Sequence, residues 1–223
     1  MNKAIIGKKL GMTQVFTPEG IVIPVTVVQA TPNIVLQKKT VEIDGYSAVQ
    51  LGFLDKKDKV ITKPVLGHCK KAGTSGKRYI KEFQLKNCDA FKIGDQVKVD
   101  IFAEGEVVDV TGVTKGRGFA GAIERHGQHR MFETHGTGPC VRQSGSMGAG
   151  TTPARVMKNR PMPGHLGTEQ VTMLNLKVIK VDKEKNLLLI KGAIPGSAGS
   201  AVYVRSAIKT QRVIKPQKVK AKK

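Results

Sequence analysis

A glycine-rich, cationic stretch from Gly112 to Gly167 most constrains what this chain can fold into. It contains 12 of the 25 glycines and 4 of the 5 histidines, and eight basic residues against two acidic ones give it a formal net charge of +6. Ordering roughly fifty residues costs about 1 kcal/mol each for the backbone alone. Burying its five aliphatic side chains contributes only about 1.5–3 kcal/mol each. We therefore expect this stretch to be disordered when alone, or to be ordered by a partner.

The charge pattern of the stretch indicates a polyanionic partner. No acidic residue occurs between Thr134 and Thr168, and a solvated linker would not need so many cations and histidines. The whole chain of 223 residues has a formal net charge of +21, which favours nucleic acid. A membrane surface is the competing anion, but no long basic amphipathic helix and no apolar run of membrane-spanning length is visible. We expect no membrane association.

The predicted nucleic-acid-binding side chains are the basic and histidine residues of this stretch, together with two lysines near the N-terminus. Arginine and lysine neutralise phosphates, while arginine planes and histidine rings stack on unpaired bases. The predicted set is Lys8, Lys9, Lys115, Arg117, Arg125, His126, His129, Arg130, His135, Arg142, Arg155, Lys158, Arg160 and His165.

Short β-branched runs on both sides of this stretch predict a mainly β protein, either a barrel or a sandwich. A charged turn after Val181 predicts that the runs on either side of it form a hairpin. The predicted strands cover Thr13–Phe16, Ile21–Ala30, Ile34–Thr40, Tyr46–Phe53, Gln96–Phe102, Val107–Thr114, Val171–Asp182, Asn186–Ile194 and Ala201–Ala207.

These strands predict one β-barrel domain over residues 1–212, with two interruptions. A lysine-rich insert covers about residues 61–92, where Tyr79, Ile80, Phe83 and Leu85 have the loose spacing of one short helix. The second interruption is an extended loop over about residues 116–167. Residues 213–223 form a basic tail that is too polar to pack and is expected to fray.

Several motifs suggest enzymes, and each lacks the context that its chemistry needs. Gly116–Gly121 matches G-x-G-x-x-G and precedes a helix-like segment, but no strand ending in an acid follows about twenty residues later. The same glycines expose backbone N–H groups that suit an RNA phosphate. Gly73–Arg78 is only a fragment of a phosphate-binding loop, with the wrong spacing.

The indications of a metal site or of a reactive thiol are weaker still. Structural zinc sites use tight ligand pairs, whereas the candidate ligands here are loosely spaced: His126, His129, His135, Cys140 and His165. A nucleophilic pair of Cys140 with a histidine has no evident orienting acid. The other cysteines, Cys69 and Cys88, are widely separated, so we expect reduced thiols in a cytosolic protein. We expect no metal, no cofactor and no catalytic residue. A generic nucleic-acid chaperone stays open as an alternative to an RNA-specific binder.

Nine residues then fall at a fixed and specific spacing: Phe102, Asp109, Gly112, Thr114, Gly116, Arg117, Gly118, Gly121 and Arg125. This spacing resembles the signature of the L3 family of large-subunit ribosomal proteins. Three further segments, Gly7–Phe16, Tyr46–Phe53 and Asn186–Gly196, are similar to bacterial members. The resemblance extends from Ile5 to about Lys209.

The resemblance implies a six-stranded β-barrel of the type found in translation factors, with a small α-containing insert. It implies a long irregular loop that enters the large-subunit (23S) ribosomal RNA, with its tip approaching the peptidyl transferase centre. It further implies early RNA binding during subunit assembly, ribosomal proteins L14 and L19 as neighbours, a place on the cytoplasmic ribosome, and no catalysis. One departure concerns a glutamine that is methylated in some members. Gly145–Gly148 is followed here by Ala149, so we expect no such modification.

Overall fold

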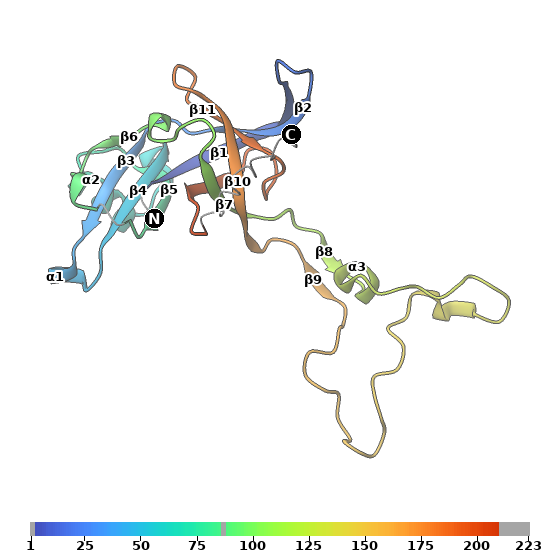
Figure 1. Cartoon of the computed structure of the whole chain (residues 1–223). Helices are drawn as coiled ribbons and strands as arrows, with labels where there is room; N and C mark the ends of the chain where they lie inside the picture. Colours follow the sequence, from blue (N-terminus) through green and yellow to red (C-terminus); the bar gives the residue numbers. More distant parts are fainter. Residues whose placement is uncertain (1–2, 86–87, 210–223) are drawn as a thin grey trace, which may run out of the picture. The chain divides into compact units, whose positions relative to one another are not determined.

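The computed structural model describes residues 3–85 and 88–209, which divide into two units (Figure 1). The described residues before Thr114 and after Glu169 form the first, which we call the body unit. Residues Thr114–Glu169 form the second, which we call the cationic unit.

Six antiparallel strands close a barrel in the body unit, in the neighbour order β1-β12-β7-β10-β11-β2. The ring is completed where β2 pairs back with β1. The strands are β1 (Ala4–Phe16), β2 (Val22–Gln29), β7 (Val107–Val113), β10 (Gln170–Asp182), β11 (Leu187–Lys191) and β12 (Ala201–Ser206). This confirms the predicted fold class, and the pairing of β10 with β11 confirms the predicted hairpin.

Strand β1 contributes to two hydrophobic cores, because successive side chains of a strand point to opposite faces. Ile5 packs inside the barrel in a cluster that includes Val108 and Leu188. Its neighbours Ala4 and Ile6 belong to a second cluster outside the barrel. All five side chains are buried, so an alternating apolar strand joins the barrel to the sheet beside it.

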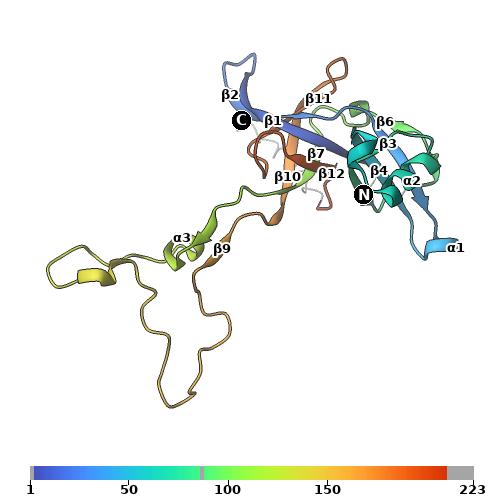
Figure 2. The same cartoon turned by 180° about the vertical axis from the view of Figure 1, so that it is seen from behind.

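That second sheet has four antiparallel strands in the order β5-β4-β3-β6. Its strands are β3 (Asn33–Lys39), β4 (Ala48–Asp55), β5 (Lys77–Phe83) and β6 (Gln96–Val97). One face carries Leu51 and Phe53 into the cluster with Ile6. Leu36 on the other face packs with Cys69 of helix α2 (Lys63–Lys71), so the sheet lies between the barrel and α2 (Figure 2).

The helix predicted around Tyr79–Leu85 is wrong: Lys77–Phe83 is strand β5, paired with β4 over its length. Both faces of this sheet are covered, so apolar side chains point both ways and imitate a helical spacing. Phe83 packs toward the barrel and Ile80 toward α2. The insert's helix lies earlier, at Lys63–Lys71, where a proline in the first turn favours helix initiation.

The strand predicted over Gln96–Phe102 is also wrong in most of its length. Only Gln96–Val97 is a strand, and Val99–Ile101 forms a 3-10 turn, η3. The turn lets Val97 pack in the cluster outside the barrel, while Val99 and Phe102 pack inside it. Burial in two different cores therefore overrides the apparent strand pattern.

The remaining elements are short. In the body unit they are α1 (Val41–Asp44), η1 (Asp58–Val60) and η2 (Cys88–Ala90). In the cationic unit they are β8 (Gly118–Ala120), α3 (Ala122–His126), η4 (Gly138–Arg142) and β9 (Gly164–Leu166). The predicted domain boundaries, with an insert at about residues 61–92, stay a prediction.

Removing one barrel side chain tests where the stability lies. Leu188→Ala should lower the free energy of unfolding by about 2–5 kcal/mol, because Leu188 is fully buried in the barrel core. Ile43→Ala, at a side chain that is 86% exposed, is the matched control and should change stability by no more than about 0.5 kcal/mol. Urea titrations of the isolated protein measure both; equal effects would contradict the assignment of the core.

Candidate nucleic-acid interface

The cationic unit begins and ends beside one strand pair. Strand β7 ends at Val113, which pairs with Gln170, the first residue of β10. Inside the cationic unit, the Thr114 N–H donates to the Glu169 carbonyl at 2.9 Å. The Glu169 N–H donates to the Thr114 hydroxyl at 3.1 Å. The two ends of the unit are therefore held together before its chain diverges.

Gly167 permits a close backbone crossing just beyond this point. Its φ of +80° lies in the left-handed region that favours glycine. A Cβ added at Gly167 would lie 2.1 Å from the Lys115 carbonyl oxygen, which is backbone and has little freedom to move. Only glycine fits this crossing without displacing the opposite limb.

A two-stranded ribbon and a short helix follow the crossing (Figure 1). Strand β8 pairs antiparallel with β9, and the Arg117 N–H extends the ladder by donating to the Leu166 carbonyl at 2.9 Å. Helix α3 is tied to the limb before β9 by two side chains on one carbonyl. Arg125 Nη1 lies 3.0 Å and His126 Nε2 lies 3.1 Å from the Met162 oxygen. This part of the cationic unit therefore has its own framework.

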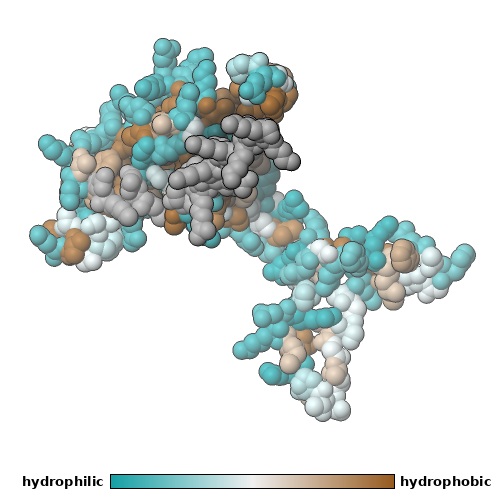
Figure 3. All heavy atoms as spheres, in the orientation of Figure 1, coloured by the Kyte–Doolittle hydropathy of each residue, from teal (hydrophilic) through white to brown (hydrophobic). Residues whose placement is uncertain are grey.

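Apart from those of the Met162 carbonyl, the described contacts of residues 127–163 lie within this range. The Met131 N–H donates to the Val141 carbonyl at 3.0 Å, and the Arg160 guanidinium donates to the Ser146 carbonyl. Most residues in this range are exposed, and hydrophilic or neutral side chains predominate over the unit in Figure 3. The segment thus has little apolar burial to support its own conformation.

Twelve of the fourteen predicted binding residues lie in the cationic unit, and all twelve are exposed. Two of them form ion pairs with the unit's acids. Arg117 Nη1 lies 3.7 Å from Glu124 Oε1, and Arg130 Nη1 lies 2.5 Å from Glu133 Oε1. Such exposed pairs contribute only about 0–1 kcal/mol, so both arginines remain accessible to a stronger anion.

The two predicted lysines of the body unit are on β1. Lys8 is half-buried. Lys9 is only 9% exposed, and its ammonium donates to the carbonyls of Ile194 at 2.8 Å and Gly196 at 2.9 Å. Lys9 therefore fixes the loop before β12, whatever else it contacts.

The enzyme-like motifs have no matching geometry in the described parts of the chain. Strand β8 lies within Gly116–Gly121, and α3 has five residues, so no strand–turn–long helix unit forms around the glycines. Within residues 3–85 and 88–209, no group of three or more His, Cys, Asp or Glu side chains could hold a metal ion. None of the described helices combines the length and apolar composition needed to cross a membrane.

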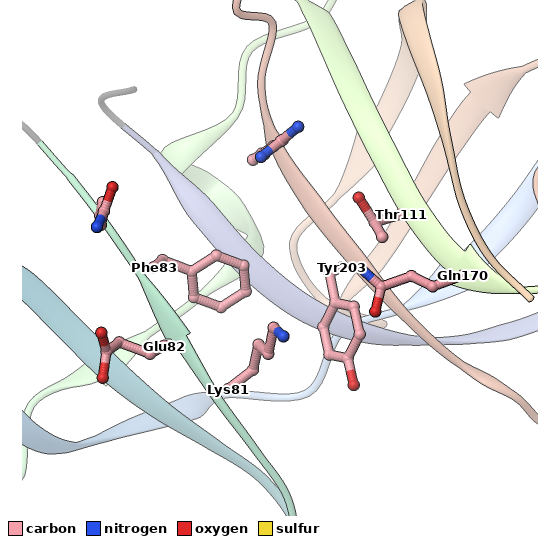
Figure 4. Close-up of a pocket in the computed structure, with 8 residues that line it drawn as sticks. Lys81, Glu82, Phe83, Thr111, Gln170 and Tyr203 are labelled. Carbon is pink, nitrogen blue, oxygen red and sulfur yellow. The ribbon is translucent and has the colours of Figure 1, made fainter.

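A hollow of about 350 Å³ lies in the body unit between β5 and the barrel (Figure 4). The Lys81 ammonium lies 5.6 Å from the centre of the Tyr203 ring, and Phe83 meets that ring edge-on. Burial, and secondarily the charge of Tyr79, raises the pKa of Tyr203. Glu82 points out of the hollow (Figure 4), and its Oε2 lies 3.6 Å from Lys39 Nζ. The hollow thus offers cation and ring contacts rather than paired acid–base groups.

Exposed apolar side chains are the feature of the cationic unit that sequence reasoning missed. Phe119 is 79% exposed and Phe132 is 87% exposed. The predicted RNA ligands are cations and histidines alone. The sequence did contain a signal for these phenylalanines: an aromatic ring in a segment with no core of its own needs another contact.

The fold and this surface define a basic β-barrel protein that presents an exposed cationic unit. The family model described as Ribosomal protein L3 matches residues 76–222. The large ribosomal subunit protein uL3 of Halalkalibacterium halodurans is 57% identical over 211 residues, which cover 95% of this chain and 100% of that protein. The uL3 of Geobacillus sp. (strain WCH70) is 55% identical, over 95% of this chain and 99% of its own length. The chain belongs to the ribosomal protein L3 family.

This membership confirms the family recognised in the sequence. It also confirms the predicted class, a ribosomal protein rather than an enzyme, and its location on the cytoplasmic ribosome. The individual binding residues stay a prediction.

A substitution at the crossing tests the geometry of the cationic unit. Gly167→Ala should shift the amide resonances of residues 115–120 and 164–168, because its Cβ would collide with the Lys115 carbonyl. Gly121→Ala is the control, since its Cβ would meet no atom within 4 Å, and its effect should stay local. Barrel resonances should not move in either protein. Two-dimensional NMR of the free protein measures this; an unchanged Gly167→Ala spectrum would contradict the crossing.

Proposed function

We propose that this chain is a structural component of the large ribosomal subunit that binds 23S ribosomal RNA directly and guides early subunit assembly. One observation carries the proposal. Twelve predicted RNA-binding side chains are exposed on a unit whose distal half has few contacts of its own. The relatives of this chain are named as proteins of the large ribosomal subunit, which supports the same function.

In the proposed mechanism, the body unit docks on the RNA surface and fixes both ends of the cationic unit. Each limb has about 26 residues, so its fully extended reach is at most ~85 Å. Glycines let the backbone pass between crowded RNA helices, and cations neutralise phosphates that otherwise repel. On the family resemblance, the tip extends toward the peptidyl transferase centre, and L14 and L19 are the neighbouring proteins.

We assign different tasks to the predicted residues. Arg142, Arg155 and Lys158 have no ion pair with the described acids, and we assign them to phosphates. Arg125 and His126 hold the Met162 carbonyl, so they position α3 as well as face solvent. The proposed organisation remains a barrel domain over residues 1–212, with an insert at about 61–92 and a loop at about 116–167. The predicted tail, 213–223, lies outside the described residues.

Removing three cations from the cationic unit tests this function. The variant Arg142→Ser, Arg155→Ser, Lys158→Ser should keep its melting temperature, because exposed changes rarely exceed about 0.5 kcal/mol each. Its affinity for 23S RNA should fall. The dependence of log K on log salt should become shallower by about 2–3, because each lost phosphate contact removes about 0.7–0.9 from the slope.

The matched control removes the same charge from the body unit through Lys56→Ser, Lys57→Ser and Lys59→Ser, all at exposed positions. Its slope should change by less than about 1. RNA titrations at several salt concentrations, paired with thermal melts, measure both proteins. Equal slopes for the two variants would show that the cationic unit is not the main RNA contact.

A further inference from the structure

The β8–β9 ribbon has one covered face and one open face. Ala120 and Gly164 are paired across the ribbon, so they share one face. Ala120 is buried, and the Arg125 guanidinium lies so close to Gly164 that an added Cβ would be 2.7 Å from Nη1. Helix α3, which also buries Ala122, therefore covers this face.

The open face carries two rings. Phe119 and His165 are directly paired in the same ribbon, one residue along from Ala120 and Gly164, so they point to the opposite face. Directly paired residues of antiparallel strands place their Cβ atoms about 4.5–5.5 Å apart. Phe119 is 79% exposed and His165 is exposed as well. Two adjacent rings thus form one accessible surface.

The ribbon holds these rings in place. The Arg117 N–H extends the strand pairing to the Leu166 carbonyl, and Arg125 ties the helix to the Met162 carbonyl. Phe132 is equally exposed but lies in an irregular segment without a strand partner. Of these two exposed phenylalanines, only Phe119 is therefore held in a fixed position for a flat ligand.

The surrounding charge identifies the kind of ligand. Lys115 and Arg117 are exposed and lie within four residues of Phe119 in sequence, and the adjacent acid, Glu124, is paired with Arg117. A flat ring that carries a neighbouring phosphate matches both the rings and the cations. Unpaired RNA bases stack on aromatic side chains in this way.

We propose that Phe119 and His165 form a stacking platform for one unpaired base of the large-subunit RNA. The platform rests on the proposed RNA-binding function and adds a specific ligand to it. The contribution of Phe119 to RNA affinity is independent of salt, because its ring carries no charge.

The test compares substitutions at Phe119 in the full chain, with transcribed 23S RNA as the probe. Phe119→Ala should weaken binding about 5- to 150-fold, the range expected for losing one base stack, with an unchanged salt slope. Phe119→Leu, which keeps an apolar side chain without a ring, should also weaken binding. Phe119→Trp should bind like the original protein. Ile43→Ala, at an exposed apolar side chain of the body unit, is the control and should change affinity less than about twofold.

NMR spectra check that each variant folds. The amide resonances of β8 and β9 should be unchanged where the hydrogen bond from Arg117 to Leu166 is intact. The Leu and Trp variants keep the comparison valid where the Ala variant disturbs the ribbon, because both residues are compatible with a strand. His165→Phe should retain affinity, whereas His165→Ser should lose it.

Three results would overturn the platform. Phe119→Leu binding as tightly as the original protein would indicate apolar packing without stacking. A loss that appears only when ribosomal proteins are added to the RNA would indicate a protein ligand. A normal affinity of Phe119→Ala, while the triple cation variant still binds weakly, would remove the platform and leave the proposed function intact. Normal affinity of both variants would show that the cationic unit is not the main RNA contact.

Discussion

The antiparallel pairing of β7 with β10 fixes where the chain segment between these two strands begins and ends. These strands belong to the barrel, and they also lead into and out of the cationic unit. A buried carboxylate stabilises the pair: Asp109 accepts from the Asn175 N–H at 2.9 Å, at an irregularity in β10, and from the Ile208 N–H at 3.1 Å beyond β12. A long segment without a core can begin and end here because the barrel has already fixed both of its ends.

The barrel strands that could be predicted are rich in β-branched residues, as at Val107–Val113. In β1 only Thr13–Phe16 was predicted, although the strand begins at Ala4. Ile5 faces the barrel core and Ile6 faces the neighbouring sheet. The prediction failed where a strand is covered on both faces. In β5, Phe83 and Ile80 pack in opposite directions, and their spacing imitated a helix. The 3-10 turn at Val99–Ile101 was not predicted either. It follows from the burial of Val99 in the barrel core, which the local sequence pattern does not record.

The candidate interface was predictable in its charge and not in its detail. A run of cations without acids indicated an anionic partner, and the twelve side chains of the cationic unit are indeed exposed. Charge alone does not reveal which cations also hold the backbone, as Lys9 and Arg125 do. Nor does it reveal Phe119, because strand pairing with His165 becomes evident only when two limbs 46 residues apart are brought together.

We propose that RNA, rather than a core of its own, orders the distal half of the cationic unit. Amide hydrogen exchange across residues 130–160, in the free protein and in its complex with 23S RNA, tests this most directly. We expect exchange near the unprotected rate in the free protein and strong protection in the complex, with barrel amides such as that of Val110 protected in both states. Strong protection of residues 130–160 without RNA would contradict it.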